Sequence, residues 1–124
     1  MTYSLAVAAG GAVGALLRYW TALASQALFG AGFPYGTLVV NTAGSLAMGF
    51  LSVLLLDRAG LGPEWRAALL VGLLGAFTTF STFSMETFNL VENGARLRAV
   101  GNVLLNVSLC LAAVWLGVIA GRKL

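Results

Sequence analysis

Long apolar runs, separated by short polar segments, make up most of this 124-residue chain. They predict helices over roughly 3–29, 36–56, 65–90 and 98–121. Each run is close to the roughly 20 residues with which a helix crosses about 30 Å of hydrocarbon. The runs are too long and too uniformly apolar for the strands of a membrane barrel. The pattern therefore indicates one domain, residues 1–124, of the all-α integral membrane class with four transmembrane helices.

Turn-forming residues separate the predicted helices. The connecting segments read GAGFPYG at 30–36, DRAGLGPE at 57–64 and VENGAR at 91–96. Glycine, proline and polar residues in such clusters interrupt helices. Because four spans return the chain to its starting side, both termini are expected on the same face of the membrane.

The composition indicates a surface that faces lipid. The chain is 60% hydrophobic and 9% charged, far from the composition of a soluble domain. The net charge of +3 is concentrated at the ends of the runs, so nucleic acid is not an expected partner. There is no histidine, and one cysteine excludes an internal disulfide and a cysteine/histidine metal site. No catalytic acid–base pair or activated nucleophile is recognisable, so we expect neither an enzyme nor an organic cofactor.

Positive charge is divided unevenly between the two faces of the membrane. One face is expected to carry Arg58, Arg66, Arg122 and Lys123, and the other Arg96 and Arg98. Cytoplasmic loops carry an excess of positive charge, so four residues against two is a weak bias. Two interpretations stay open: both termini lie in the cytoplasm, or the chain inserts in both orientations.

The segment GLLGAFTTFSTFSMETF, residues 72–88, combines aromatic rings with hydroxyl groups. Phe80 and Phe83 continue a three-residue spacing from Phe77, which ordinarily indicates packing. An aromatic ring also has a positive edge, so rings presented edge-on beside hydroxyl donors stabilise an anion that has lost its water. Packing and anion binding both stay open as interpretations of these rings.

Glycines before Thr78 predict that the third helix is broken near its middle. Gly72 and Gly75 precede the pair Thr78-Thr79 within the apolar run. At membrane depth, broken backbone survives only inside protein or against water. The carbonyl oxygens that such a break frees are able to bind a cation.

Polar side chains recur at four-residue spacing on two of the predicted helices. They are Thr37, Asn41 and Ser45 on the second helix, and Asn102, Asn106 and Cys110 on the fourth. This spacing places each set on one face of its helix. Asparagines in membrane helices commonly hold neighbouring helices together. Alternatively, the two stripes line a narrow wet track, in which neutral N–H donors solvate a small anion without trapping it.

Two charged residues fall within the predicted spans. Arg18 either extends toward the interface beside Tyr19 and Trp20 or faces an aqueous cavity that attracts anions. Glu86 lies toward one end of the third helix. It either extends toward the interface as well or tunes the access of protons or ions from a vestibule.

Three motifs resemble the Fluc (CrcB) family of fluoride channels over essentially the whole chain. They are GGAVGALLRYW near the N-terminus, GTLVVNTAGSLAMGF in the second predicted helix and GLLGAFTTFSTFSMET in the third. The resemblance implies an antiparallel, dual-topology homodimer with two fluoride pores in a prokaryotic cytoplasmic (inner) membrane. It also implies passive export of fluoride, which lowers the fluoride concentration of the cytoplasm.

The resemblance assigns roles to individual residues. It implies that Phe80 and Phe83 are pore phenylalanines and that Asn41 is the pore asparagine of the second helix. Gly75 and Thr78 match the broken part of the third helix, whose carbonyls hold a structural sodium ion at the dimer interface. The remaining matches to the fluoride pathway are Ser81, Thr82, Glu86, Arg18 and the fourth-helix positions Asn102, Asn106 and Cys110.

Two other functional classes stay open. A proton-coupled exporter of the small multidrug resistance type is also a dual-topology dimer, but it needs an acid in the first helix, where this chain has Arg18. A purely structural subunit would not need two polar stripes. The glycine pairs Gly10/Gly14 and Gly117/Gly121 favour a dimer, because small residues allow helices to associate closely.

Overall fold

The computed structural model describes residues 2–57 and 60–124, and all regular structure in these ranges is helical. The first, second and fourth spans are the helices α1 (Thr2–Phe29), α2 (Tyr35–Asp57) and α6 (Arg96–Lys123). The third span consists of α3 (Pro63–Arg66), the π-helix η1 (Ala67–Leu74), α4 (Gly75–Phe77) and α5 (Phe80–Glu92). Each of the four spans is long and apolar enough to cross a membrane. The predicted all-helical fold with four spans is therefore confirmed.

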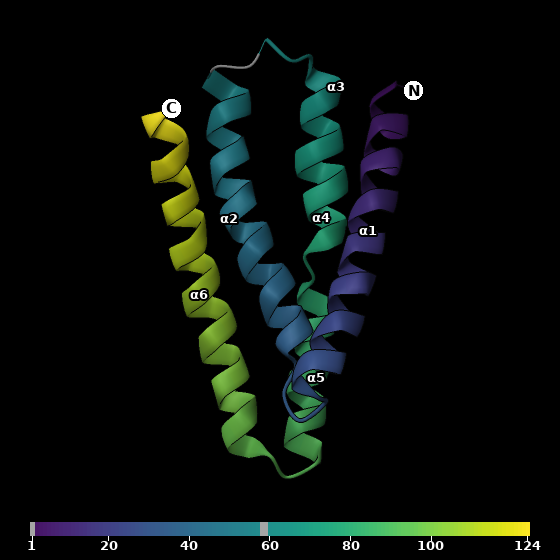
Figure 1. Ribbon diagram of the computed structural model, residues 1–124, viewed down its shortest axis with the longest axis vertical. Helices are drawn as coiled ribbons and strands as arrows, with labels where there is room; N and C mark the ends of the chain where they lie inside the picture. The colour runs from purple at the N-terminus through teal and green to yellow at the C-terminus, as the bar shows by residue number, and fades with distance from the viewer. Residues whose placement is uncertain (1, 58–59) are drawn as a thin grey trace.

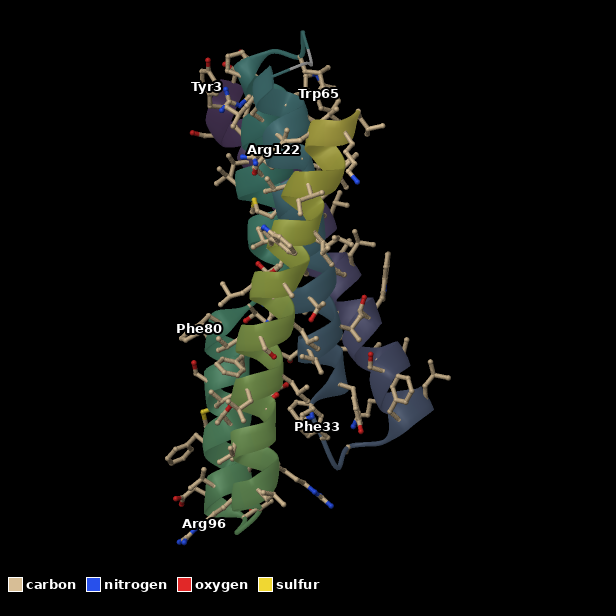
Figure 2. The ribbon with its side chains drawn as sticks, turned by 90° about the vertical axis from the view of Figure 1, so that its left-hand side faces the viewer. Tyr3, Phe33, Trp65, Phe80, Arg96 and Arg122 are labelled. Carbon is tan, nitrogen blue, oxygen red and sulfur yellow. The ribbon has the colours of Figure 1, made fainter. Side chains whose placement is uncertain are left out.

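Both chain termini lie at the same end of the bundle (Figure 1). Figure 2 shows Trp65 and Arg122 at that end and Arg96 at the opposite end. The described basic residues are thus divided between the ends as the loop pattern predicts. Arg58, which the charge count includes, lies outside the described residues.

Two turns, at residues 30–34 and 93–95, lie at the end of the bundle opposite the termini. Each contains a glycine with positive φ. Gly30 has a φ of 76° and Gly94 a φ of 79°, a conformation that side chains with a Cβ rarely adopt. Gly30 ends α1 by donating its N–H to the Gln26 carbonyl at 2.9 Å. Arg98 Nη1 donates to the Gly32 carbonyl at 3.1 Å, which ties the first turn to the start of α6.

Glycines bring the backbones of neighbouring spans into contact within the chain. α1 packs closely on η1, and α2 packs most extensively on α6. A Cβ at Gly14 would collide with the carbonyl oxygen of Leu73, and one at Gly117 with that of Leu46. Because Gly10 faces Ala68 in the same way, these small-residue faces are already filled. The expectation that they form the dimer contact is therefore wrong.

The same correction holds for the last glycine of the fourth span. A Cβ at Gly121 would approach the Phe50 carbonyl oxygen and the Val53 side chain to 3.0 Å. Gly121 thus packs against α2 rather than offering a free face. A second copy of the chain would have to associate through other surfaces.

Candidate functional site

The helical path of the third span stops for two residues. Thr78 has φ −83° and ψ 161°, and Thr79 has φ −156° and ψ 120°, so both are extended. Thr78 directs its N–H and its hydroxyl to the Leu74 carbonyl, at 3.0 and 2.9 Å. Thr79 caps the start of α5, because its Oγ1 accepts the Thr82 N–H at 3.1 Å. Two threonines thus close one helix and begin the next.

Asn41 of α2 satisfies both backbone groups of Thr79. The Thr79 N–H donates to Asn41 Oδ1 at 2.8 Å, and Asn41 Nδ2 donates to the Thr79 carbonyl at 3.0 Å. Only a carboxamide carries a donor and an acceptor in this arrangement. The pairing replaces hydrogen bonds that the extended backbone has lost, which matters because Thr79 is buried.

The carbonyl groups of Gly75 and Thr78 lose their helical donors where the path stops. In a continuous α-helix the Thr79 N–H would bond to the Gly75 carbonyl, but here it donates to Asn41 Oδ1. Likewise the Thr82 N–H, which would bond to the Thr78 carbonyl, donates to Thr79 Oγ1. Within residues 2–57 and 60–124, no group of three or more His, Cys, Asp or Glu could hold a metal ion. Carbonyl oxygens that have lost their helical donors are able to bind a cation.

A chain of hydrogen bonds, which we call the amide relay, runs from Asn41 through Asn106 and Asn102 to Thr87. Asn41 Nδ2 donates to Asn106 Oδ1 at 3.1 Å. Asn106 Nδ2 donates to the carbonyl and to Oδ1 of Asn102, at 3.0 and 2.9 Å. Asn102 Nδ2 donates to Thr87 Oγ1 at 2.9 Å, and Thr87 donates to the Phe83 carbonyl at 2.7 Å. The relay joins α2, α6 and α5 through the interior of the bundle.

A cavity of about 450 Å³ lies beside the extended residues. Its polar lining comes from both stripes and from the third span, namely Asn41, Ser45, Thr78, Thr79, Asn106 and Cys110. Phe80 also borders it and is 78% exposed in the single chain, whereas Phe83 is 8% exposed. The two rings are 5.3 Å apart between centroids and tilted by 52°. Figure 2 shows Phe80 pointing outward from the middle of the bundle.

A second cavity, of about 360 Å³, lies toward the end of the bundle that carries the 30–34 turn. It is lined by Thr37 and Glu86, and Thr37 Oγ1 donates to Glu86 Oε1 at 2.9 Å. Glu86 Oε2 is buried and has no partner among the described residues. Thr37 lines this cavity, while Asn41 and Ser45 line the other. The stripe on α2 therefore borders both cavities along about 12 Å of helix.

The other predicted site residues lie at different distances from these cavities. Ser81 and Thr82 are exposed on α5, where both approach Thr79 Oγ1, at 3.4 and 3.0 Å. Asn102 is fully enclosed and lines neither cavity. Arg18 is half-buried on α1 and is also absent from both linings. Arg18 is thus not brought together with the remaining residues within one chain.

Two members of the site are given no site role in the sequence-based prediction, although Thr79 is named there in the predicted break of the third helix. Thr79 stands immediately before α5 and three residues before Thr82, which is the position and spacing of a helix N-cap. A threonine before a helix is a recognisable N-cap signal, but Thr78, Ser81 and Thr82 beside it carry the same signal. Thr87 ends the amide relay, and nothing in its sequence neighbourhood distinguishes it from other hydroxyl residues of the segment.

Known proteins resemble this chain over nearly its whole length. The family described as CrcB-like protein, Camphor Resistance (CrcB), matches residues 5–118. A protein named Fluoride-specific ion channel FluC from Methylococcus capsulatus is 56% identical over 119 residues, 96% of this chain and 52% of that protein. The chain therefore spans about half the length of this relative.

Two relatives of the same name match over at least 94% of the length of both chains. The protein from Shewanella amazonensis is 54% identical over 117 residues, which are 94% of each chain. The protein from Geobacter sulfurreducens is 47% identical over 124 residues, which are 100% of each chain. The resemblance that the three sequence motifs indicate is thus confirmed.

Proposed function

Because this chain belongs to the CrcB-like protein family, we propose that it is a fluoride-specific ion channel through which fluoride leaves the bacterial cytoplasm passively. It is a multi-pass membrane protein, and relatives of its family are named as ion channels rather than as enzymes. The observation that carries the proposal is the coincidence of this family with a cavity bordered by Asn41, the extended threonines and an exposed phenylalanine ring.

We propose that fluoride passes the cavity beside Phe80 and Asn41, with Asn106 and Cys110 along the same wall. The path continues past Phe83, whose ring lies 5.3 Å from that of Phe80. The ring edges and the Cys110 thiol offer positive charge density to a dehydrated anion without a formal positive charge, while Asn41 and Asn106 shape this wall through their hydrogen bonds to protein acceptors. The anion is then held strongly enough to enter and weakly enough to leave. The exposed hydroxyls of Ser81 and Thr82 supply further donors on α5.

Two charged residues belong to the approaches of the proposed pathway. Glu86 borders the cavity at the end that carries the 30–34 turn, where it accepts a hydrogen bond from Thr37. Arg18 attracts anions toward the protein from the first span. Asn102 contributes through its hydrogen bonds rather than by contact with the ion, because it is fully enclosed.

The channel is an antiparallel homodimer in this proposal. The exposed ring of Phe80 supports it, since a second copy would enclose a ring that the single chain leaves 78% exposed. The carbonyls of Gly75 and Thr78 support a structural sodium ion between the two copies. Gly75 is exposed, and its carbonyl has lost its helical donor. Pooling such oxygens from two chains gives a hard cation the ligands it prefers.

Fluoride efflux from liposomes that contain only this protein tests the proposed function. We expect a fluoride gradient to dissipate without an imposed proton gradient, and chloride to leave far more slowly. Protein-free liposomes are the control. Flux that requires a proton gradient and carries organic cations would instead establish an exporter of the multidrug type. An absence of any fluoride flux above the control would reject the channel.

Reporter fusions at the C-terminus test the dual topology. Because the predicted loops carry four positive charges against two, the charge bias that fixes orientation is weak. We expect a reporter that works in the cytoplasm and one that works outside it both to be active. Adding three lysines after Leu124 should silence the outer reporter. Activity on one face in the unmodified chain would show that all copies share one orientation.

A further inference from the structure

We propose that the amide relay is a positioning device: Thr87, Asn102 and Asn106 hold the Asn41 carboxamide in the one orientation that pairs with the Thr79 peptide. The inference rests on the proposed function, because the peptide that is held borders the proposed fluoride pathway. Asn102 and Thr87 act through their neighbours and do not touch the ion. The relay gives the fluoride path its shape from a distance.

Backbone groups fix which way the carboxamides of Asn41 and Asn106 are turned, and so fix the direction in which the relay donates its hydrogen bonds. Asn41 must turn its oxygen to the Thr79 N–H and its nitrogen to the Thr79 carbonyl. Asn106 must turn its nitrogen to the Asn102 carbonyl, because a carbonyl only accepts. The oxygen of Asn106 therefore faces the nitrogen of Asn41, and the two orientations agree.

The far end of the relay has the same direction. The Asn102 oxygen accepts from Asn106, so its nitrogen is left to donate to Thr87 Oγ1. The Thr87 hydroxyl in turn donates a hydrogen bond to the Phe83 carbonyl, which can only accept. From Asn41 through Asn106 and Asn102 to Thr87, each side chain hence donates to the next one along the relay. Hydrogen bonds aligned in this way polarise and strengthen one another.

The relay leaves no donor of Asn41 unused. One N–H of its carboxamide bonds to the Thr79 carbonyl and the other to Asn106 Oδ1. If Asn106 were to turn, Asn41 would lose an acceptor, and its pairing with Thr79 would compete with new partners. The position of the Thr79 peptide in turn sets the start of α5 and the direction of the Phe80 ring. Removing the Thr87 hydroxyl should therefore alter the position of the Thr79 peptide at the cavity, although Asn102 and Asn106 lie between the two.

Replacing Thr87 with valine tests the relay from its far end. Thr87→Val keeps the shape of the side chain and removes the hydroxyl, whereas Thr87→Ser keeps the hydroxyl. Ser108→Ala is the matched control on α6, because the Ser108 hydroxyl only donates to the Leu104 carbonyl at 2.6 Å. Fluoride and chloride efflux are measured from liposomes for each variant. We expect Thr87→Val to lose fluoride flux and selectivity over chloride, each by about tenfold, with Thr87→Ser and Ser108→Ala like the parent.

Hydrogen exchange of the asparagine side chains, followed by NMR in micelles, tests the relay without any ion flux. In the parent protein, both side-chain N–H groups of Asn41 should exchange far more slowly than those of Asn89, which is exposed on α5. Thr87→Val should accelerate exchange at Asn41, and Thr87→Ser should not. The comparison of Asn41 with Asn89 needs only the parent protein, so it still tests the relay if the Thr87→Val variant fails to fold.

The two readouts separate the relay from the proposed function. Rapid exchange at Asn41 in the parent would overturn the relay whatever the protein conducts. Thr87→Val with parental exchange at Asn41, parental flux and parental selectivity would also overturn it. A parent with protected Asn41 side chains but no fluoride flux would reject the channel and keep the relay. Reduced flux with unchanged selectivity and unchanged exchange would reduce Thr87 to a packing role and reject the relay.

Discussion

Replacing Phe80 or Phe83 with isoleucine is expected to reduce fluoride efflux by orders of magnitude while the proposed dimer stays assembled. Isoleucine retains most of the bulk and the apolar character of the side chain, but it lacks the ring quadrupole whose positive edge attracts an anion. Fluoride is small and hard, so it loses much hydration free energy on entering a narrow path, and few groups are present to replace its water. Removing one ring therefore removes a large part of the compensation.

Efflux of fluoride and chloride, measured side by side with gel filtration of each variant, checks this expectation. Phe88→Ile is the matched control for Phe80→Ile, because Phe88 lies on the same helix, is 55% exposed and, unlike Phe80, lines neither cavity. Phe83 is largely buried, so its substitution should also destabilise the chain by about 1 to 3 kcal/mol through imperfect packing. Phe80 is mostly exposed and should not. Assembled Phe80→Ile and Phe83→Ile variants with parental flux would reject the ring-edge mechanism without rejecting the channel.

If the proposed sodium site exists, exchanging sodium for a large organic cation during purification is expected to impair ion conduction and to weaken the proposed dimer. Carbonyl oxygens at Gly75 and Thr78 carry partial negative charge, and two copies facing each other would repel without a cation between them. A large organic cation cannot enter such a site. Gel filtration and liposome efflux, before and after sodium is returned, measure the effect.

Recovery on the return of sodium would identify the loss as removal of a bound ion rather than as denaturation. Potassium serves as the comparison, since a site shaped by carbonyl oxygens distinguishes ions by size and field strength. A dimer that keeps its full stability and its full flux in the organic cation would exclude a structural role for sodium. A resolved dimer without an ion between the two copies would exclude the site itself.

The spans were predictable from the sequence because their signals are local. Apolar length defines each span, and charged or turn residues end it, as at Gly30 and Gly94, whose positive φ values stop the preceding helices. The two polar stripes were equally visible, since four-residue spacing fixes a helix face. The third span differs from a simple helix in that η1 is a π-helix. Its apolar residues AALLVGLL contain no signal that separates this form from an α-helix.

The contacts of the candidate site were not predictable, because they join residues far apart in the chain. Asn41 and Thr79 are 38 positions apart, and Asn41 and Asn106 are 65 apart. The sequence left open whether the asparagines hold helices together or face an ion. The structure shows each of them in hydrogen bonds between or along helices. Their contact with fluoride stays a prediction.

The glycines show how a local pattern is assigned to the wrong partner. Gly14 and Gly117 carry the signal of close helix association, and that association exists. The partner is another span of the same chain, because a small residue admits any backbone of suitable direction. Spacing alone therefore identifies a contact surface without identifying its occupant.

The hydrogen bonds that hold the Thr79 peptide have a consequence for acid tolerance. They are made by carboxamides, hydroxyls and backbone groups, and none of these gains or loses a proton under conditions in which proteins stay folded. The extended segment therefore presents the same donors and acceptors in an acidic medium as in a neutral one. In a cell whose surroundings become acidic, this part of the protein therefore keeps its conformation. Any sensitivity of ion flow to acidity must arise elsewhere, as at the Glu86 carboxylate.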